Sequence, residues 1–137
     1  MPQVINHHTA LIYVMVTISA VDRRITDAEF AHIGALVQQL PVFGDFDPER
    51  LVHTAEECGE ILSTEGGLEA MLGLVAEALP EKLHETAYAL AVEVAAADLS
   101  LEQEELRFLQ MLRDRLDLDK LSVAAIERSA RARYMKL

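Results

Sequence analysis

The chain has 137 residues, a length typical of one domain, and 51% of them are hydrophobic, so it can bury a core and is not expected to be disordered. Its single cysteine, Cys58, excludes an intramolecular disulfide and a metal site of several cysteines, and we expect a buried thiol there. The formal net charge of −11 argues against nucleic acid as a partner, because the phosphate backbone repels an acidic protein.

The pattern of apolar residues predicts helices throughout, since no segment shows the alternation that is typical of strands. The first run, 8–21, is apolar on nearly every face, as in a central buried helix, and is too short to span a bilayer. Thr26 and Glu29 predict a capping box, Asp47 precedes a proline at a helix start, and Ser122 is expected to cap the last helix. In chain order the seven predicted helices are 8–21, 26–40, 48–62, 68–79, 80–97, 102–116 and 123–135.

An internal repeat relates the two halves of the chain at a constant offset of 76 residues. Asp22 and Glu29 correspond to Asp98 and Glu105, and each Asp follows an apolar helix, has an aliphatic residue three positions later and a Glu seven positions later. Short loops join the predicted helices. We therefore predict an all-α fold of about seven helices in a compact bundle, one domain over residues 1–137, with pseudo-symmetric halves at about 9–62 and 80–135.

The spacing in each copy matches the second half of an EF-hand calcium loop, in which an Asp and a Glu seven residues later bind the ion. Each copy lacks the first half of that loop, so neither forms a complete site alone. Together Asp22, Glu29, Asp98 and Glu105 supply four carboxylates, enough for one divalent cation such as calcium, magnesium, manganese or zinc. For Glu29, helix capping is the competing interpretation, whereas the pattern gives Glu105 no capping role.

Other chemistry finds less support in the sequence. Glu29 with His32, and Glu81 with His84, form the Glu-x-x-His pairs of di-iron bundles, but the further inward glutamates that such a site needs are missing. The chain has no glycine-flanked serine and no phosphate-binding glycine loop, so we do not expect an enzyme.

Three further polar side chains receive no functional role at this stage. His7 and His8 lie near the N-terminus, where we expect them to be solvated. Glu93 lies five residues before Asp98 on the same predicted helix. It could lean toward the acidic motif, but an exposed position is the simpler expectation.

The charges are unevenly distributed along the chain. Residues 25–106 contain 18 Asp and Glu but only Arg50 and Lys82, a local net charge of −16. The basic C-terminal segment is either a solvated helix face or a surface for an acidic protein partner or an anionic inner-membrane surface. No targeting segment stands out, so we expect a cytoplasmic protein. The eight basic residues of this segment are Arg107, Arg113, Arg115, Lys120, Arg128, Arg131, Arg133 and Lys136.

The repeated motif, in an all-helical chain of this size, resembles the TerB-like tellurite-resistance proteins over residues 10–130. The resemblance implies a compact helical domain with a metal site at the four carboxylates named above, in bacterial stress-response systems linked to tellurite or as a module fused to other domains. Both copies depart from the usual Asp-Gly of the family, because Arg23 and Leu99 stand where glycine is expected. A metal-free helical module that binds a protein partner is the alternative.

Overall fold

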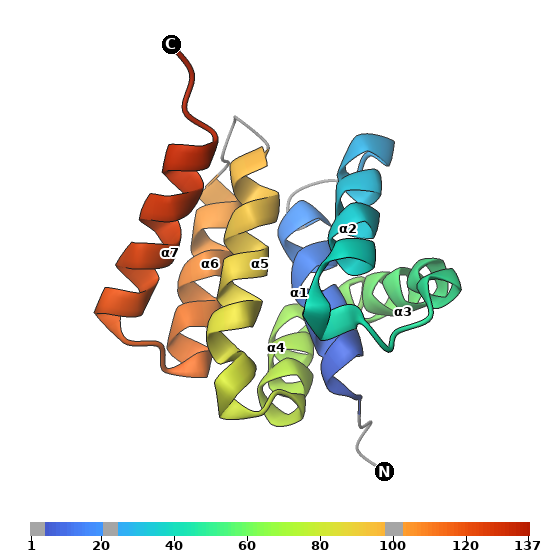
Figure 1. Cartoon of the computed structure of the whole chain (residues 1–137). Helices are drawn as coiled ribbons and strands as arrows, with labels where there is room; N and C mark the ends of the chain where they lie inside the picture. The colour runs from blue at the N-terminus through green and yellow to red at the C-terminus, as the bar shows by residue number, and fades with distance from the viewer. Residues whose placement is uncertain (1–4, 21–24, 98–102) are drawn as a thin grey trace.

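The computed structural model describes residues 5–20, 25–97 and 103–137, and the regular structure of these residues is entirely helical. Seven α-helices pack into a compact bundle (Figure 1), which confirms the predicted fold class. No helix in the described part of the chain is long and apolar enough to cross a membrane. The elements are α1 (His7–Ala20), α2 (Asp27–Gln39), η1 (Pro41–Phe43), η2 (Pro48–Arg50), α3 (Leu51–Leu62), α4 (Gly67–Ala78), η3 (Glu81–Leu83), α5 (His84–Ala97), α6 (Gln103–Leu116) and α7 (Lys120–Arg133).

The centre of the bundle is α1, as its uniformly apolar sequence predicts. Nearly all of its side chains are buried, and it packs against α2, α3, α4, α5 and α6. The second buried helix, α5, lies beside α1 and carries α6 and α7 on its other sides (Figure 1). The outer helices are amphipathic: α6 buries Phe108, Leu109, Leu112 and Leu116 at helical spacing and exposes charged residues between them.

The helix contacts in the two halves of the chain correspond. In the first half, α1 packs against α2 and α3, and in the second, α5 packs against α6 and α7. Across the halves, α1 contacts α6 and α5 contacts α2. These contacts agree with the predicted pseudo-symmetry, and the internal repeat stays a prediction.

Two glycines fix the turn between α3 and α4. Gly66 has a backbone φ of +73°, a left-handed conformation that glycine adopts without steric strain. A Cβ on Gly67 would lie 2.0 Å from the carbonyl oxygen of Ile61, so this position admits no side chain without a shift of the backbone.

The start of α7 differs from the prediction. The N-cap is Asp119, whose backbone is extended and whose carboxylate accepts a hydrogen bond from the amide of Ser122 at 3.0 Å. The predicted cap at Ser122 is therefore wrong, because the Asp three residues earlier satisfies that amide and the helix begins at Lys120.

The environment of His8 also differs from the prediction, since the side chain is buried rather than solvated. Its Nε2 lies 2.9 Å from the carbonyl oxygen of Val42 and 3.1 Å from a carboxylate oxygen of Asp45. Its ring packs against Phe43 and Phe46. An apolar segment distant in the sequence covers the histidine, which no local pattern near the N-terminus could indicate.

Cys58 is buried, as expected. Its sulfur lies 3.5 Å from the hydroxyl oxygen of Thr17 and donates to the carbonyl oxygen of Tyr13 at 3.7 Å. Burial raises the pKa of the thiol to about 11, so at neutral pH it is almost fully protonated.

Tyr13 and Tyr88 are both buried, but their hydroxyls differ in hydrogen bonding. The Tyr13 hydroxyl has no hydrogen-bond partner among the described residues, whereas the Tyr88 hydroxyl donates to Glu127 and accepts from Arg113 at 2.8 Å. Burial raises the pKa of each phenol to about 12.

We expect Tyr13→Phe to leave the free energy of unfolding unchanged or to raise it by about 1 kcal/mol, because it removes a buried polar group without a partner. Tyr88→Phe should lower it by about 1–2 kcal/mol, because hydrogen bonds to charged groups are lost. Urea unfolding of the two variants measures both values, and a larger loss for Tyr13→Phe than for Tyr88→Phe would contradict this assignment.

Candidate functional site

Glu29 is the third residue of α2 and forms the predicted capping box with Thr26. The amide of Thr26 donates to Glu29 Oε1 at 2.8 Å, and the amide of Glu29 donates to Thr26 Oγ1 at 3.1 Å. The capping interpretation is therefore confirmed, and it holds the half-buried carboxylate at the start of α2. Asp22, the other predicted ligand of this copy, lies outside the described residues.

Glu105 is the third residue of α6, the same position that Glu29 has in α2. Its exposed fraction is 3%, and no other Asp or Glu in the described ranges is buried. Burial disfavours the ionised form of a carboxylate, whereas the positive end of the α6 dipole favours it. Asp98, the second ligand predicted for this copy, also lies outside the residues that the structure describes.

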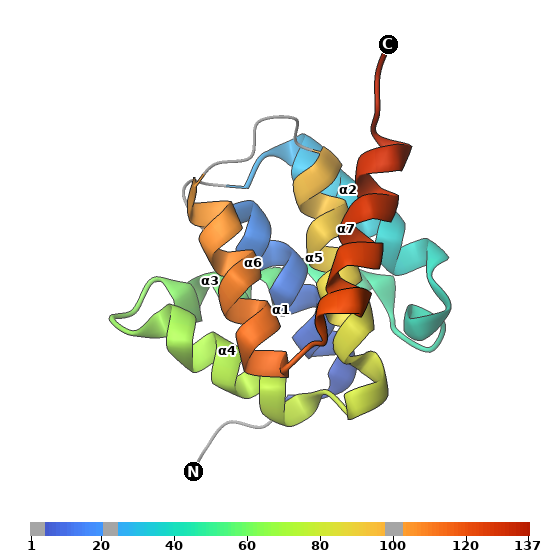
Figure 2. The same cartoon turned by 90° about the vertical axis from the view of Figure 1, so that its left-hand side faces the viewer.

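The fold places both glutamates at one end of the bundle. The helices α1 and α5 run in the same direction, and their C-terminal ends lie at the end of the molecule where α2 and α6 begin (Figures 1 and 2). Within the described ranges, no three His, Cys, Asp or Glu side chains lie close enough together to bind a metal ion. The assignment of Asp22, Glu29, Asp98 and Glu105 as ligands therefore stays a prediction.

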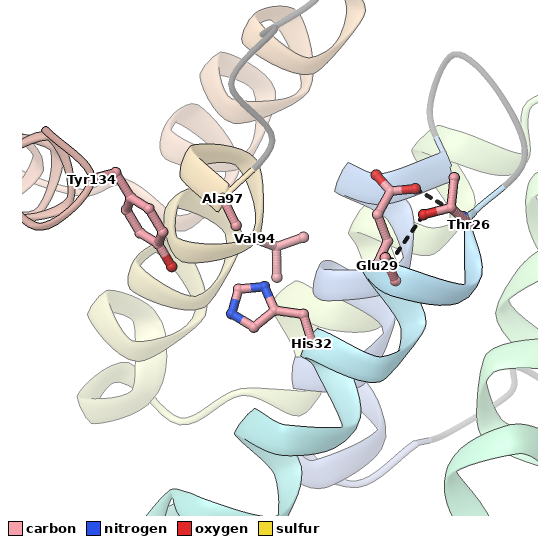
Figure 3. A pocket seen from close by; sticks show the side chains of 7 residues that line it. Thr26, Glu29, His32, Val94, Ala97 and Tyr134 are labelled. Atoms are coloured by element: carbon pink, nitrogen blue, oxygen red, sulfur yellow. Dashed lines mark hydrogen bonds between the residues drawn. The ribbon is translucent and has the colours of Figure 1, made fainter. Parts of the chain in front are cut away.

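An open pocket of about 420 Å³ lies beside the start of α2. Thr26, Glu29 and His32 line it from α2 and its cap, and α5 contributes Val94 and Ala97 (Figure 3). The ring of Tyr134, which follows α7, completes the lining. The pocket therefore lies between the N-terminal end of α2 and the C-terminal ends of α5 and α7.

Glu93 contacts two residues that line this pocket, His32 and Tyr134, and the expectation that it is exposed is wrong. Its side chain is only 18% exposed, and it accepts hydrogen bonds from Tyr134 and Arg133. His32 Nε2 lies 3.9 Å from its second carboxylate oxygen. The sequence signal for the partial burial of Glu93 is its position as a single acid within the apolar part of α5. The sequence does not indicate its basic partner, Arg133, which lies 40 residues further along the chain.

The electrostatic environment of Glu93 favours its ionised form. Partial burial alone would raise the pKa of this carboxyl, but the hydrogen bonds from Tyr134 and Arg133 and the charges of Arg133 and His32 outweigh burial. The pKa is therefore lowered from its ordinary value of 4.5. Glu93 links α5 to α2 and to the end of α7.

The two Glu-x-x-His pairs have unrelated environments. His32 faces Glu93, whereas the two ring nitrogens of His84 lie 3.3 Å and 3.2 Å from the carbonyl oxygens of Leu116 and Leu79. Glu81 is exposed in η3, outside the helix that carries His84. This arrangement gives the di-iron alternative no support.

The bundle, with a glutamate in the first turn of both α2 and α6, agrees with the resemblance seen in the sequence. The chain matches the family model described as tellurite resistance protein TerB over residues 8–129, and it therefore belongs to the TerB tellurite resistance family. No curated protein and no solved structure matches the chain.

We expect Glu93→Gln to destabilise the protein at neutral pH and to have less effect in acid. The pKa of Glu93 is lower in the native protein than in the unfolded chain, so the unfolded chain binds a proton at this carboxylate first as the pH falls. The stabilisation by ionised Glu93 is therefore lost as the pH falls from about 5 through the lowered pKa. Urea unfolding at several pH values measures the difference between the two proteins. Glu56→Gln, at an exposed position on α3, is the matched control and should change stability little at each pH. A destabilisation by Glu93→Gln that is constant down to about pH 3 would contradict the ionised role of Glu93.

Proposed function

We propose that this chain is a non-catalytic cytoplasmic module of a bacterial stress response related to tellurite resistance, and that it binds one divalent cation through Asp22, Glu29, Asp98 and Glu105. Its membership of the TerB family supports the link to tellurite resistance. The single observation that carries the cation proposal is the burial of Glu105 in the first turn of α6, at the position that Glu29 has in α2.

The chemistry of these donors fits a hard cation. Carboxylate oxygens are the ligands that calcium, magnesium and manganese prefer, whereas zinc more often takes nitrogen or sulfur ligands. The Glu29 carboxylate accepts the Thr26 amide through Oε1, and a carboxylate has lone pairs for a second interaction. A bound cation would supply positive charge at the end of the bundle where Glu29 and Glu105 lie.

A second candidate function is protein binding without a metal. The observation that favours it is the basic helix α7, which packs against α5 and borders a groove with α6. The two functions use different surfaces, so a test of one leaves the other open.

Thermal unfolding after EDTA treatment, followed by addition of calcium, magnesium, manganese or zinc, tests the cation proposal. An ion that binds only the folded state at ~100 times its dissociation constant should add ~2.7 kcal/mol. For a domain of this size that corresponds to a rise in Tm of about 8–10 °C. Asp98→Asn and Glu105→Gln should each reduce the rise, whereas Glu104→Gln, an exposed neighbour in the same turn, should keep it.

Two outcomes would contradict the cation proposal. If no ion changes the melt, the chain does not bind a divalent cation. If Asp22→Asn and Asp98→Asn both leave an observed rise intact, the ion binds at a different place.

The capping role and the ligand role of Glu29 can be separated by two substitutions. Glu29→Gln keeps an oxygen that accepts the Thr26 amide, so without metal it should change stability by less than about 0.5 kcal/mol, but it should reduce the gain from the cation. Thr26→Ala removes the cap and should cost about 1 kcal/mol while keeping that gain. An undiminished gain in Glu29→Gln would assign this residue to capping alone.

A further inference from the structure

A groove lies between α6 and α7, over the surface of α5. Both outer helices pack against α5, but the backbones of α6 and α7 approach each other at few points (Figure 2). The space between them has a volume of about 850 Å³. Small and apolar side chains form its floor and inner walls, among them Val92 and Ala95 from α5, Leu109 from α6 and Ala130 from α7.

Large apolar side chains also stand at the rim of this groove. Leu106 on α6 is 51% exposed and Met135, just after α7, is 67% exposed, and both line the groove. Single exposed apolar residues are common on protein surfaces, but two that border the same apolar groove extend its hydrophobic surface outward. Methionine is unbranched and flexible, so Met135 can adapt to the shape of a bound partner.

The charges along the groove are mainly positive. At one end, Arg113 and Glu127 form an ion pair of 3.3 Å between α6 and α7. Arg131 and Lys136 line the rest of the α7 side, and neither forms an ion pair with a described residue. These two cations are exposed, in contrast to the acidic body of the chain, which has a net charge of −16 over residues 25–106.

We propose that this groove binds an acidic amphipathic helix of a protein partner. The apolar face of such a helix would cover the floor and the two rim residues, and its acidic flank would lie along Arg131 and Lys136. The groove extends along α6 from Leu106 to Arg113, about two helical turns, which is long enough for the apolar positions i to i+7 of a bound helix. Binding of this kind does not depend on the proposed cation.

The exposed apolar rim of the groove favours a helix over a small amphiphile. A small-molecule site typically buries 70–90% of its ligand within the pocket, whereas here Leu106 and Met135 extend the apolar surface outside it. A membrane fits less well, because the lipid surface cannot enter a groove between two helices and an anionic surface would repel the acidic remainder of the chain.

A selection from a peptide library provides the test with the full-length chain. The peptides are helices of about 20 residues with apolar side chains at positions i, i+3, i+4 and i+7 and with Glu, Lys, Gln or Ala elsewhere. The expected result is an enrichment of peptides with an excess of Glu over Lys. Fluorescence anisotropy of the enriched peptides then gives their Kd values, which should rise with increasing salt.

Substitutions at the groove locate the binding surface. Leu106→Glu and the double variant Arg131→Glu with Lys136→Glu should each weaken binding at least tenfold. The controls are Val52→Glu, a 56% exposed apolar position on α3, and Lys82→Glu, an exposed cation in η3, and both should change Kd less than twofold. All these positions are exposed, and circular dichroism verifies that each variant is folded.

Each of four other results would overturn the proposal. The first is that no peptide is enriched, and the second is that the enriched peptides are not acidic. The third is that the enriched peptides bind the Leu106→Glu variant as tightly as the native chain. The fourth is that no peptide binds, while the groove substitutions abolish a different association. This association would be either binding to phosphatidylglycerol vesicles or a concentration-dependent dimer seen by sedimentation. The groove would then bind a membrane surface or a second copy of the chain.

Discussion

The burial of α1 is the constraint on which the rest of this structure depends. A helix that is apolar on every side cannot be covered by one neighbour, and α2, α3, α4, α5 and α6 all pack around it. The position of α5 beside α1, in the same direction, brings the starts of α2 and α6 to one end of the bundle (Figure 1). The location of Glu29 and Glu105 at that end therefore follows from the hydrophobic core rather than from any attraction between carboxylates, which would repel one another.

The fold could be predicted well from the sequence because its main signals are local. Helical periodicity and the Thr26 capping box each need only neighbouring residues, and the structure confirms both. Signals that depend on distant segments were missed. The burial of His8 under Phe43 and the position of Glu93 under Arg133 result from tertiary packing, which spacing along the chain does not encode.

The candidate site was predicted only in part. The capping role of Glu29 could be read from its spacing to Thr26, but the burial of Glu105 could not, because it depends on how α6 docks against its neighbours. Asp22 and Asp98 lie outside the described residues, so the repeat spacing remains the basis for their assignment. The groove between α6 and α7 could not be predicted from the sequence, because it depends on how two helices pack on α5; the sequence leaves the basic C-terminal segment either a solvated helix face or a surface for a partner.

The environment of Cys58 has a consequence for this member of the tellurite resistance family. The thiolate is the form that reacts with peroxides and with other thiols, and a pKa of about 11 leaves very little of it at neutral pH. Burial against Thr17 and Tyr13 also keeps oxidants away from the sulfur. Since Cys58 is the sole cysteine of the chain and its thiol is buried, oxidising conditions cannot form an intramolecular disulfide and cannot readily convert this thiol to a sulfenic acid.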